Sequence, residues 1–110
     1  QGANLVNAKL IHVSTDYVFN GKSNVPYSEI IPTSPTSIYG LTKLEGEQLA
    51  LREANTCAIL RTSWLYSSYG NNFVKTITRL ATERDSLGII FDQVGTPTYA
   101  KDLAKAGIRL

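Results

Sequence analysis

A tyrosine and a lysine stand four positions apart in the stretch YGLTK, at Tyr39 and Lys43. Side chains four positions apart on an α-helix share one face, so the Lys43 ammonium can lie beside the Tyr39 phenol. A neighbouring cation stabilises a phenolate, which lets the phenol give and take a proton near neutral pH. The same spacing also occurs by chance on exposed helices, so its meaning depends on the surrounding elements.

The pair needs a helix beneath it, and the sequence predicts one. We expect this helix to begin near Ser37 or Ile38, with Ser37 as its N-cap, and to end near Asn55. The charged residues of the segment, among them Glu45 and Glu47, are predicted to face solvent. The buried face is predicted to carry the leucines of the segment, Leu41, Leu44, Leu49 and Leu51.

Short apolar runs predict three strands, at residues 9–15, 57–62 and 87–91. Two further helices are predicted, one within residues 70–86 and one from residue 100. Strands that lack clear alternation and take turns with helices indicate a parallel sheet covered on both faces. The predicted fold class is therefore α/β, with a doubly wound parallel sheet.

Three prolines block regular structure between residues 18 and 37, so we expect a long irregular excursion there. Ligands of open parallel sheets bind beyond the carboxyl ends of the strands. Two stretches stand at such ends, STDYVF after the first strand and RTSWLY after the second. They place Thr15, Asp16 and Trp64 among the candidate site residues.

Five blocks in order carry a resemblance to a known family: STDYVFNG, PTSIYGLTKLEGE, LRTSWLYS, GNNFVKTITRLATER and DQVGTPTYAKDLA. Together, from about residue 9 to residue 110, they resemble the extended, sugar-nucleotide branch of the short-chain dehydrogenase/reductase superfamily. Within that branch they are most similar to the dTDP-4-dehydrorhamnose reductase family. The resemblance implies a Rossmann-like fold and reduction, by NADPH or NADH, of the 4-keto group of a nucleotide-linked deoxysugar.

The resemblance also implies roles for individual residues. Tyr39 would give a proton to the developing alkoxide, and Lys43 would make that phenol more acidic and bind the nicotinamide ribose. Thr15 would hold the substrate carbonyl oxygen, and Asp16 would bind the sugar. Trp64 would form a wall for the deoxysugar. Tyr39, Lys43 and Thr15 are thus the predicted catalytic set, with Tyr39 and Lys43 also contacting the cofactor.

Several other residues have simpler explanations. His12 lies within an apolar strand, where a structural role is expected. Asn72 could face the substrate or, like Asn71, cap a helix, and Phe73 could face it or belong to the core. The stretch GTPTYA is expected to shape a turn near the site, with Thr98 and Tyr99. No residues stand at metal-ligand spacing, so no metal site is predicted.

No Gly-rich dinucleotide fingerprint occurs between a strand and a helix anywhere in the sequence. We therefore expect residues 1–110 to be a single partial Rossmann-like domain that lacks the N-terminal dinucleotide-binding βαβ unit, an internal fragment of a longer enzyme. Alone, it is expected neither to bind cofactor tightly nor to turn over. Uncovered apolar strands would favour a homo-oligomer, most simply a dimer.

Composition excludes some partners. The net charge is +2 and no basic run is present, which gives no support for nucleic-acid or membrane-surface binding. No apolar stretch approaches the ~18 residues of a transmembrane helix. Cys57 is the only cysteine, so no internal disulfide can form, and a reducing compartment, the cytoplasm, is expected.

Two alternatives stay open at this stage. The chain could belong to another nucleotide-sugar epimerase or reductase of the same branch that uses the same Tyr–Lys pair. It could instead belong to a non-catalytic binding subunit that keeps the fold, like the regulatory subunit of methionine adenosyltransferase. Intact Thr15, Tyr39 and Lys43 favour an enzyme.

Overall fold

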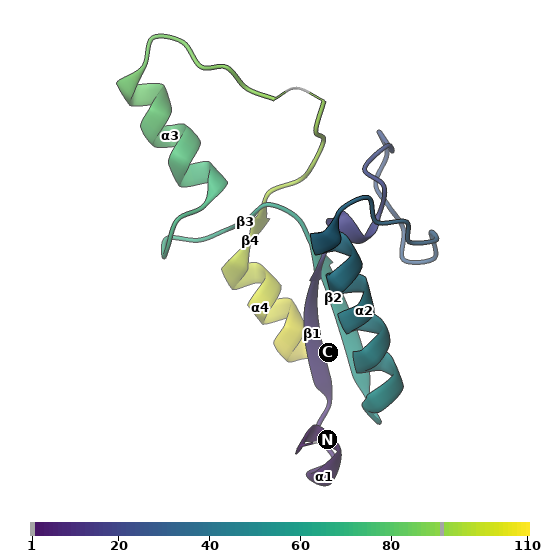
Figure 1. The fold of residues 1–110 in the computed structure, drawn as a ribbon. Coiled ribbons are helices and arrows are strands. Elements are labelled where there is room, and N and C mark those ends of the chain that lie inside the picture. Colours follow the sequence, from purple (N-terminus) through teal and green to yellow (C-terminus); the bar gives the residue numbers. More distant parts are fainter. Residues whose placement is uncertain (1, 91) are drawn as a thin grey trace. The chain divides into compact units, whose positions relative to one another are not determined.

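The computed structural model describes residues 2–90 and 92–110, and this part of the chain divides into two compact units (Figure 1). The first runs to Thr62 and also includes Leu110, and the second spans residues 63–109. The first unit contains α1 (Gly2–Leu5), β1 (Leu10–Thr15), the 3-10 helix η1 (Asp16–Val18), α2 (Ile38–Glu53) and β2 (Cys57–Thr62). The second contains β3 (Leu65–Tyr66), α3 (Phe73–Glu83), β4 (Thr98–Tyr99) and α4 (Ala100–Arg109).

The first unit is built on a parallel pair of strands. β1 and β2 pair from Leu10 opposite Cys57 to Thr15 opposite Thr62, and α2 packs along both strands (Figure 1). Parallel strands cannot be joined by a tight turn, so the connection runs through a helix. The carboxyl ends of both strands therefore lie at the same edge. This arrangement confirms the predicted strands at 9–15 and 57–62 and the α/β class with parallel strands.

The start of α2 is set by a cap and by a glycine. The Ser37 side chain accepts a hydrogen bond from the Gly40 amide at 3.1 Å, which confirms Ser37 as the N-cap. Gly40 is buried, and a Cβ atom there would lie 2.1 Å from the carbonyl oxygen of Tyr17. Pro35 would also lie only 3.1 Å from that atom. Only glycine lets the first turn of α2 approach η1 this closely.

Replacing Gly40 by alanine is therefore expected to push the first turn of α2 away from η1. The clash is with backbone, which cannot rotate aside, so we expect a loss of about 1–3 kcal/mol in the free energy of unfolding. Thermal unfolding measures this loss, with Gly46→Ala as the matched control on the same helix. A Cβ at Gly46 would meet nothing closer than 3.6 Å, at His12. Equal melting temperatures for the two variants would contradict the prediction.

The buried face of α2 differs from the predicted one. Leu41, Leu49 and Leu51 are exposed, and the buried residues of the helix are Gly40 and Glu47. The prediction that Glu47 faces solvent is wrong, because its carboxylate is held beneath the helix by an arginine of β2. The leucine spacing predicted the wrong buried face, because a glycine and a glutamate paired with arginine are the buried residues of this helix.

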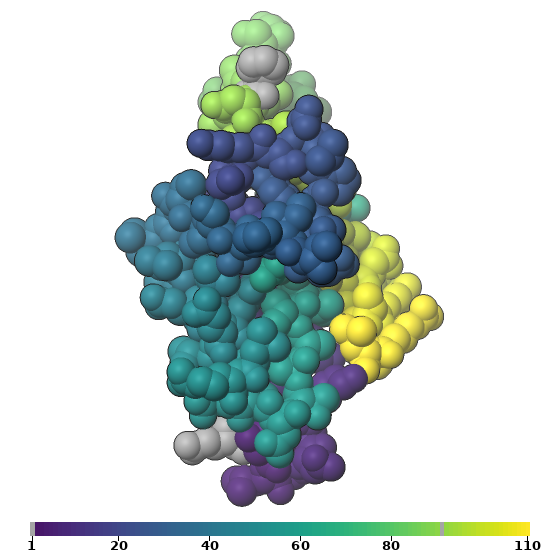
Figure 2. Space-filling model, turned by 90° about the vertical axis from the view of Figure 1, so that its right-hand side faces the viewer, coloured from purple at the N-terminus to yellow at the C-terminus, as the bar shows by residue number. Residues whose placement is uncertain are grey.

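The excursion after η1, residues 19–37, contains no helix or strand, as expected. Phe19 is buried and its ring stacks on Tyr27, with ring centroids 4.3 Å apart and the planes nearly parallel. The Ser34 amide donates to the Val18 carbonyl at 2.9 Å, which brings the end of the excursion back to its start. Figure 2 shows the excursion in dark blue beside the first turns of α2.

The second unit has a smaller parallel sheet. Leu65 of β3 pairs with Thr98 of β4, and Tyr66 pairs with Tyr99. Thr98 and Tyr99 therefore form a strand rather than the expected turn. Helices α3 and α4 confirm the two predicted helices, and the Asn72 side chain caps α3 by accepting from the Lys75 amide at 3.0 Å.

The strand predicted at 87–91 is wrong for residues 87–90, which belong to no helix or strand, and Phe91 lies outside the described residues. Ile89 and Ile90 are exposed, so a short apolar run was not sufficient to predict a strand here. Across the described ranges, no helix combines the length and apolar character needed to cross a membrane.

Candidate active site

The carboxyl end of β1 carries the first group of candidate residues. The Thr15 hydroxyl is buried, accepts from the Tyr17 amide at 3.2 Å and donates to Oδ1 of Asp16 at 3.1 Å. A carboxylate only accepts, so the Thr15 proton points to Asp16 in this state. The arrangement makes Thr15 the cap of η1 and leaves further acceptor capacity on Asp16. Both residues thus stand at the sheet edge where parallel sheets bind ligands.

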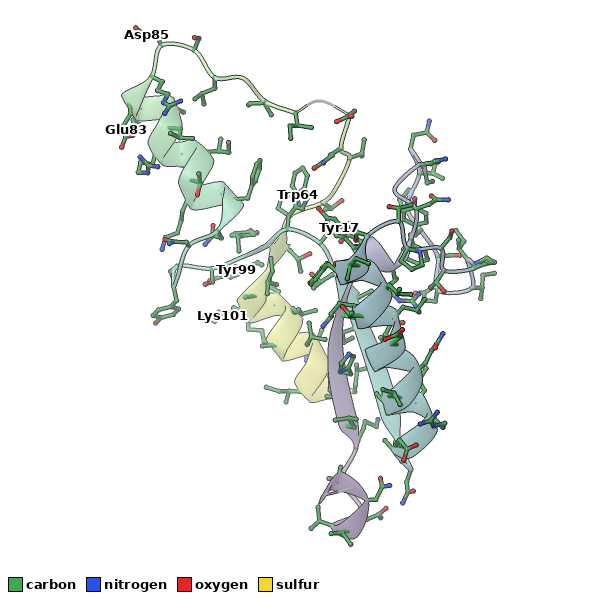
Figure 3. The ribbon with its side chains drawn as sticks, viewed as in Figure 1. Tyr17, Trp64, Glu83, Asp85, Tyr99 and Lys101 are labelled. Carbon is green, nitrogen blue, oxygen red and sulfur yellow. The ribbon has the colours of Figure 1, made fainter. Side chains whose placement is uncertain are left out.

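Tyr39 lies in the first turn of α2 and is 56% exposed. Its ring meets the ring of Tyr17 edge to face, with centroids 5.8 Å apart and an interplanar angle of 78°. Figure 3 shows Tyr17 next to the start of α2. This contact joins the helix that carries Tyr39 to the segment that follows Thr15 and Asp16. Sequence reasoning did not single out Tyr17, although it stands within STDYVF.

Lys43 lies one turn further along α2, and its ammonium group donates to the carbonyl oxygen of Val13 at 2.8 Å. Val13 is a β1 residue two positions before Thr15, so Lys43 ties α2 to the strand that leads into the site. An ammonium group has three donors, and this bond uses one of them. The structure thus brings Thr15, Asp16, Tyr39 and Lys43 together in one unit.

A buried ion pair lies beneath α2, one turn after Lys43. Arg61 of β2 donates two hydrogen bonds to the Glu47 carboxylate, from Nε to Oε1 at 3.0 Å and from Nη2 to Oε2 at 2.7 Å. The Glu47 side chain is 2% exposed and the Arg61 side chain 27%. The guanidinium carbon of Arg61 also stands 5.1 Å from the centre of the Phe19 ring. An arginine inside an otherwise apolar strand was the one sequence signal that could have revealed this pair.

The environment of Glu47 has opposing effects on its protonation. Burial has the largest single effect and would raise the pKa of the Glu47 carboxyl, but the combined effect of its polar neighbours, with hydrogen bonding from Arg61 first among them, leaves the pKa below its ordinary value. Ser14 and His12 of β1 also lower the pKa of Glu47. The Ser14 hydroxyl contributes although it forms no hydrogen bond of ordinary geometry within the described residues. In turn, the hydrogen bond to Glu47 raises the pKa of Arg61. Glu47 is therefore a buried carboxylate that stays charged.

Trp64 belongs to the second unit. Its backbone has φ +45°, in the left-handed region that side chains other than glycine rarely adopt. A Cβ at Gly95 would lie 2.8 Å from the Trp64 indole, and the Phe73 ring centroid lies 4.9 Å from the Trp64 ring centroid. Figure 3 shows the indole next to the β3–β4 pair. A strained backbone and close ring contacts hold Trp64 in one orientation.

The first unit has an open hollow of about 470 Å³. Its lining comes from the excursion, the end of α2 and β2: Phe19, Tyr27, Ser28, Glu29, Leu51, Ile59, Leu60 and Arg61. This lining does not include Thr15, Asp16, Tyr39 or Lys43. In residues 2–90 and 92–110, no group of three or more His, Cys, Asp and Glu side chains is placed to hold a metal ion.

Comparisons with known proteins show which family the chain resembles. The family model described as RmlD substrate binding domain matches residues 1–110. A dTDP-4-dehydrorhamnose reductase of Aggregatibacter actinomycetemcomitans is 49% identical over 104 residues, which is 94% of this chain and 35% of that protein. The chain therefore spans about a third of the length of the curated relatives it matches.

Two solved structures share the fold. A dTDP-4-dehydrorhamnose reductase of Clostridium acetobutylicum has a TM-score of 0.90 and 45% identity, covering 97% of this chain and 38% of that one. A dTDP-4-dehydrorhamnose reductase of Bacillus anthracis, solved in complex with NADP, has a TM-score of 0.89 and 47% identity with the same coverage. This likeness confirms the Rossmann-like fold class.

Proposed function

Because the chain belongs to the RmlD substrate binding domain family, we propose that the whole protein reduces dTDP-4-dehydro-L-rhamnose to dTDP-L-rhamnose with NADPH or NADH. One observation carries the proposal. Tyr39 and Lys43 share a helix face whose start contacts the segment after Thr15, so a proton donor, a cation and a hydroxyl converge at one sheet edge. The names of the relatives and the NADP in a solved neighbour support the substrate and the cofactor.

The residues present fit the ribose end of a nicotinamide cofactor. Among the described residues Lys43 uses one of its three ammonium donors, on Val13, and Tyr39 is more than half exposed. When bound, the reduced nicotinamide supplies the hydride. The sequence contains no Gly-rich turn for the diphosphate, so only this end of the cofactor is assigned to residues of this chain.

In the proposed reaction, the phenol of Tyr39 donates its proton to the oxygen of the substrate carbonyl as charge develops there. Lys43 stabilises the phenolate that remains and hydrogen-bonds the cofactor ribose. Thr15 turns its hydroxyl from Asp16 to the same carbonyl oxygen. Asp16, relieved of that hydrogen bond, accepts from a sugar hydroxyl. Trp64 supplies the apolar wall for the deoxysugar.

The setting of the whole protein completes the proposal. Residues 1–110 would form part of a single Rossmann-like domain, and the enzyme would work in the cytoplasm as a homodimer. Ile11 and Val13 of β1 are exposed apolar side chains of the kind that association, or other segments of the whole protein, would bury.

The test is turnover by the whole protein. NADPH oxidation is followed by its absorbance, with the enzyme-independent rate subtracted, with dTDP-4-dehydro-L-rhamnose and, in parallel, with other 4-keto nucleotide sugars. We expect the rhamnose precursor to give the highest kcat/KM. Interconversion of nucleotide sugars without net cofactor oxidation would favour the epimerase alternative. Tight binding without turnover of any substrate would favour the binding subunit.

A further inference from the structure

The Glu47–Arg61 pair connects the three segments on which the candidate site is built. Glu47 stands on α2, four residues after Lys43, and Arg61 stands on β2 opposite Ser14 of β1. The same guanidinium that grips Glu47 lies over the ring of Phe19, which follows η1 directly. One side chain therefore contacts both the helix that carries the proton donor and the segment that follows Thr15 and Asp16.

Stability alone is a weak reason for such a pair. Removing two charges from water costs about as much as their attraction returns, and well-packed apolar side chains often do as well. What a bidentate arginine–carboxylate pair adds is geometry, because two parallel hydrogen bonds fix the distance and the orientation of both groups. A leucine pair would let α2 slide or rotate on the strands, whereas this pair defines its register.

Lys43 is the residue that this register would control. Its bond to the Val13 carbonyl places the ammonium group over β1, and Glu47 is the next residue on the same face of α2. A small shift of α2 would alter the bond from Lys43 to Val13 and the position of Lys43 and Tyr39 relative to Thr15. Catalytic geometry tolerates little of this, since a displacement of ~1 Å can cost on the order of 10²-fold in rate.

We propose that Glu47 and Arg61 are positioning residues of the active site, which hold α2 in register so that Lys43 and Tyr39 stay aligned with Thr15. The inference rests on the proposed function. Neither residue touches the reacting atoms, and both act through Lys43 and Tyr39. The pair thereby fixes the position of α2 relative to the carboxyl ends of β1 and β2.

The test compares Glu47→Gln with wild type in the whole protein. The amide keeps the size of the side chain and removes its charge. We expect kcat to fall about 10–100-fold, with KM for the nucleotide sugar changed less than about twofold because no substrate contact is lost. A merely structural role would lower the melting temperature without this split between kcat and KM.

Two further variants keep the test decisive. Glu53→Gln removes the exposed pair with Arg52 on the same helix and is expected to leave kcat and KM unchanged. Arg61→Lys keeps the charge but loses the bidentate grip, and it takes the place of Glu47→Gln if that variant does not fold. An active wild type, with kcat unchanged in Glu47→Gln and Arg61→Lys, overturns the inference alone. A wild type without turnover overturns the proposed function and this inference with it.

Discussion

Replacing Tyr39 by phenylalanine is expected to lower kcat of the whole protein about 10²–10⁴-fold, the usual contribution of a positioned acid or base. The change removes only the hydroxyl group. The ring, and with it the edge-to-face contact with Tyr17, stays in place. Because Tyr39 is 56% exposed, its loss of a polar atom should leave the free energy of unfolding within about 0.5 kcal/mol of wild type.

The measurement is steady-state NADPH oxidation together with thermal unfolding of the same preparations. Tyr69→Phe is the matched control, because Tyr69 is an exposed tyrosine outside the candidate site. It should keep full activity. If Tyr39→Phe also kept full activity, Tyr39 could not be the proton donor, and a binding role for the fold would gain support.

Replacing Arg61 by leucine is expected to be the most destabilising change, because it leaves the Glu47 carboxylate buried without its partner. Breaking a buried ion pair costs about 3–5 kcal/mol, and the partial exposure of Arg61 places this variant at the lower end of that range. The loss should depend on pH. Groups that face Glu47 are His12 and Ser14 of β1 and Arg61 of β2.

The direction of the pH dependence follows from the pKa of Glu47. In the wild type this pKa is lowered, so its stabilising contribution is present above the unfolded value of about 4.3 and is lost as pH falls through the folded value. Without Arg61, burial dominates and raises the pKa instead. The penalty is then largest near neutral pH and shrinks as pH falls towards the raised pKa.

Urea unfolding of the whole protein between about pH 5 and pH 8 measures this effect. The double variant Arg61→Leu/Glu47→Gln is the control, since it retains His12 but has no buried carboxylate. The difference between single and double variant should grow with pH. A difference that is constant across the range would show that lost packing, not the unpaired charge, causes the destabilisation.

The candidate site was predictable where local rules decide it. Helical spacing places Tyr39 and Lys43 on one face, Ser37 marks the start of their helix, and a parallel strand puts Thr15 and Asp16 at a sheet edge. None of these inferences needs a contact between distant residues.

The long-range contacts that position the candidate site residues could not be predicted from local sequence patterns. The bond from Lys43 to Val13 and the pair of Glu47 with Arg61 join positions far apart in sequence. For the same reason, the leucine pattern of α2 predicted the wrong buried face. The buried residues of α2 are a glycine and a glutamate, and the contacts that bury them cannot be predicted from local sequence.

The excursion between η1 and α2 has a consequence for how proteins of this kind can diverge. Its ends are brought together by Ser34 and Val18, while the pairing of β1 with β2 does not depend on its interior. Doubling the length of a loop adds only about 0.6 kcal/mol to the entropy of closing it. Insertions or deletions between Tyr27 and Ser34 would therefore cost little, and natural selection could change the length and composition of this surface without rebuilding the fold.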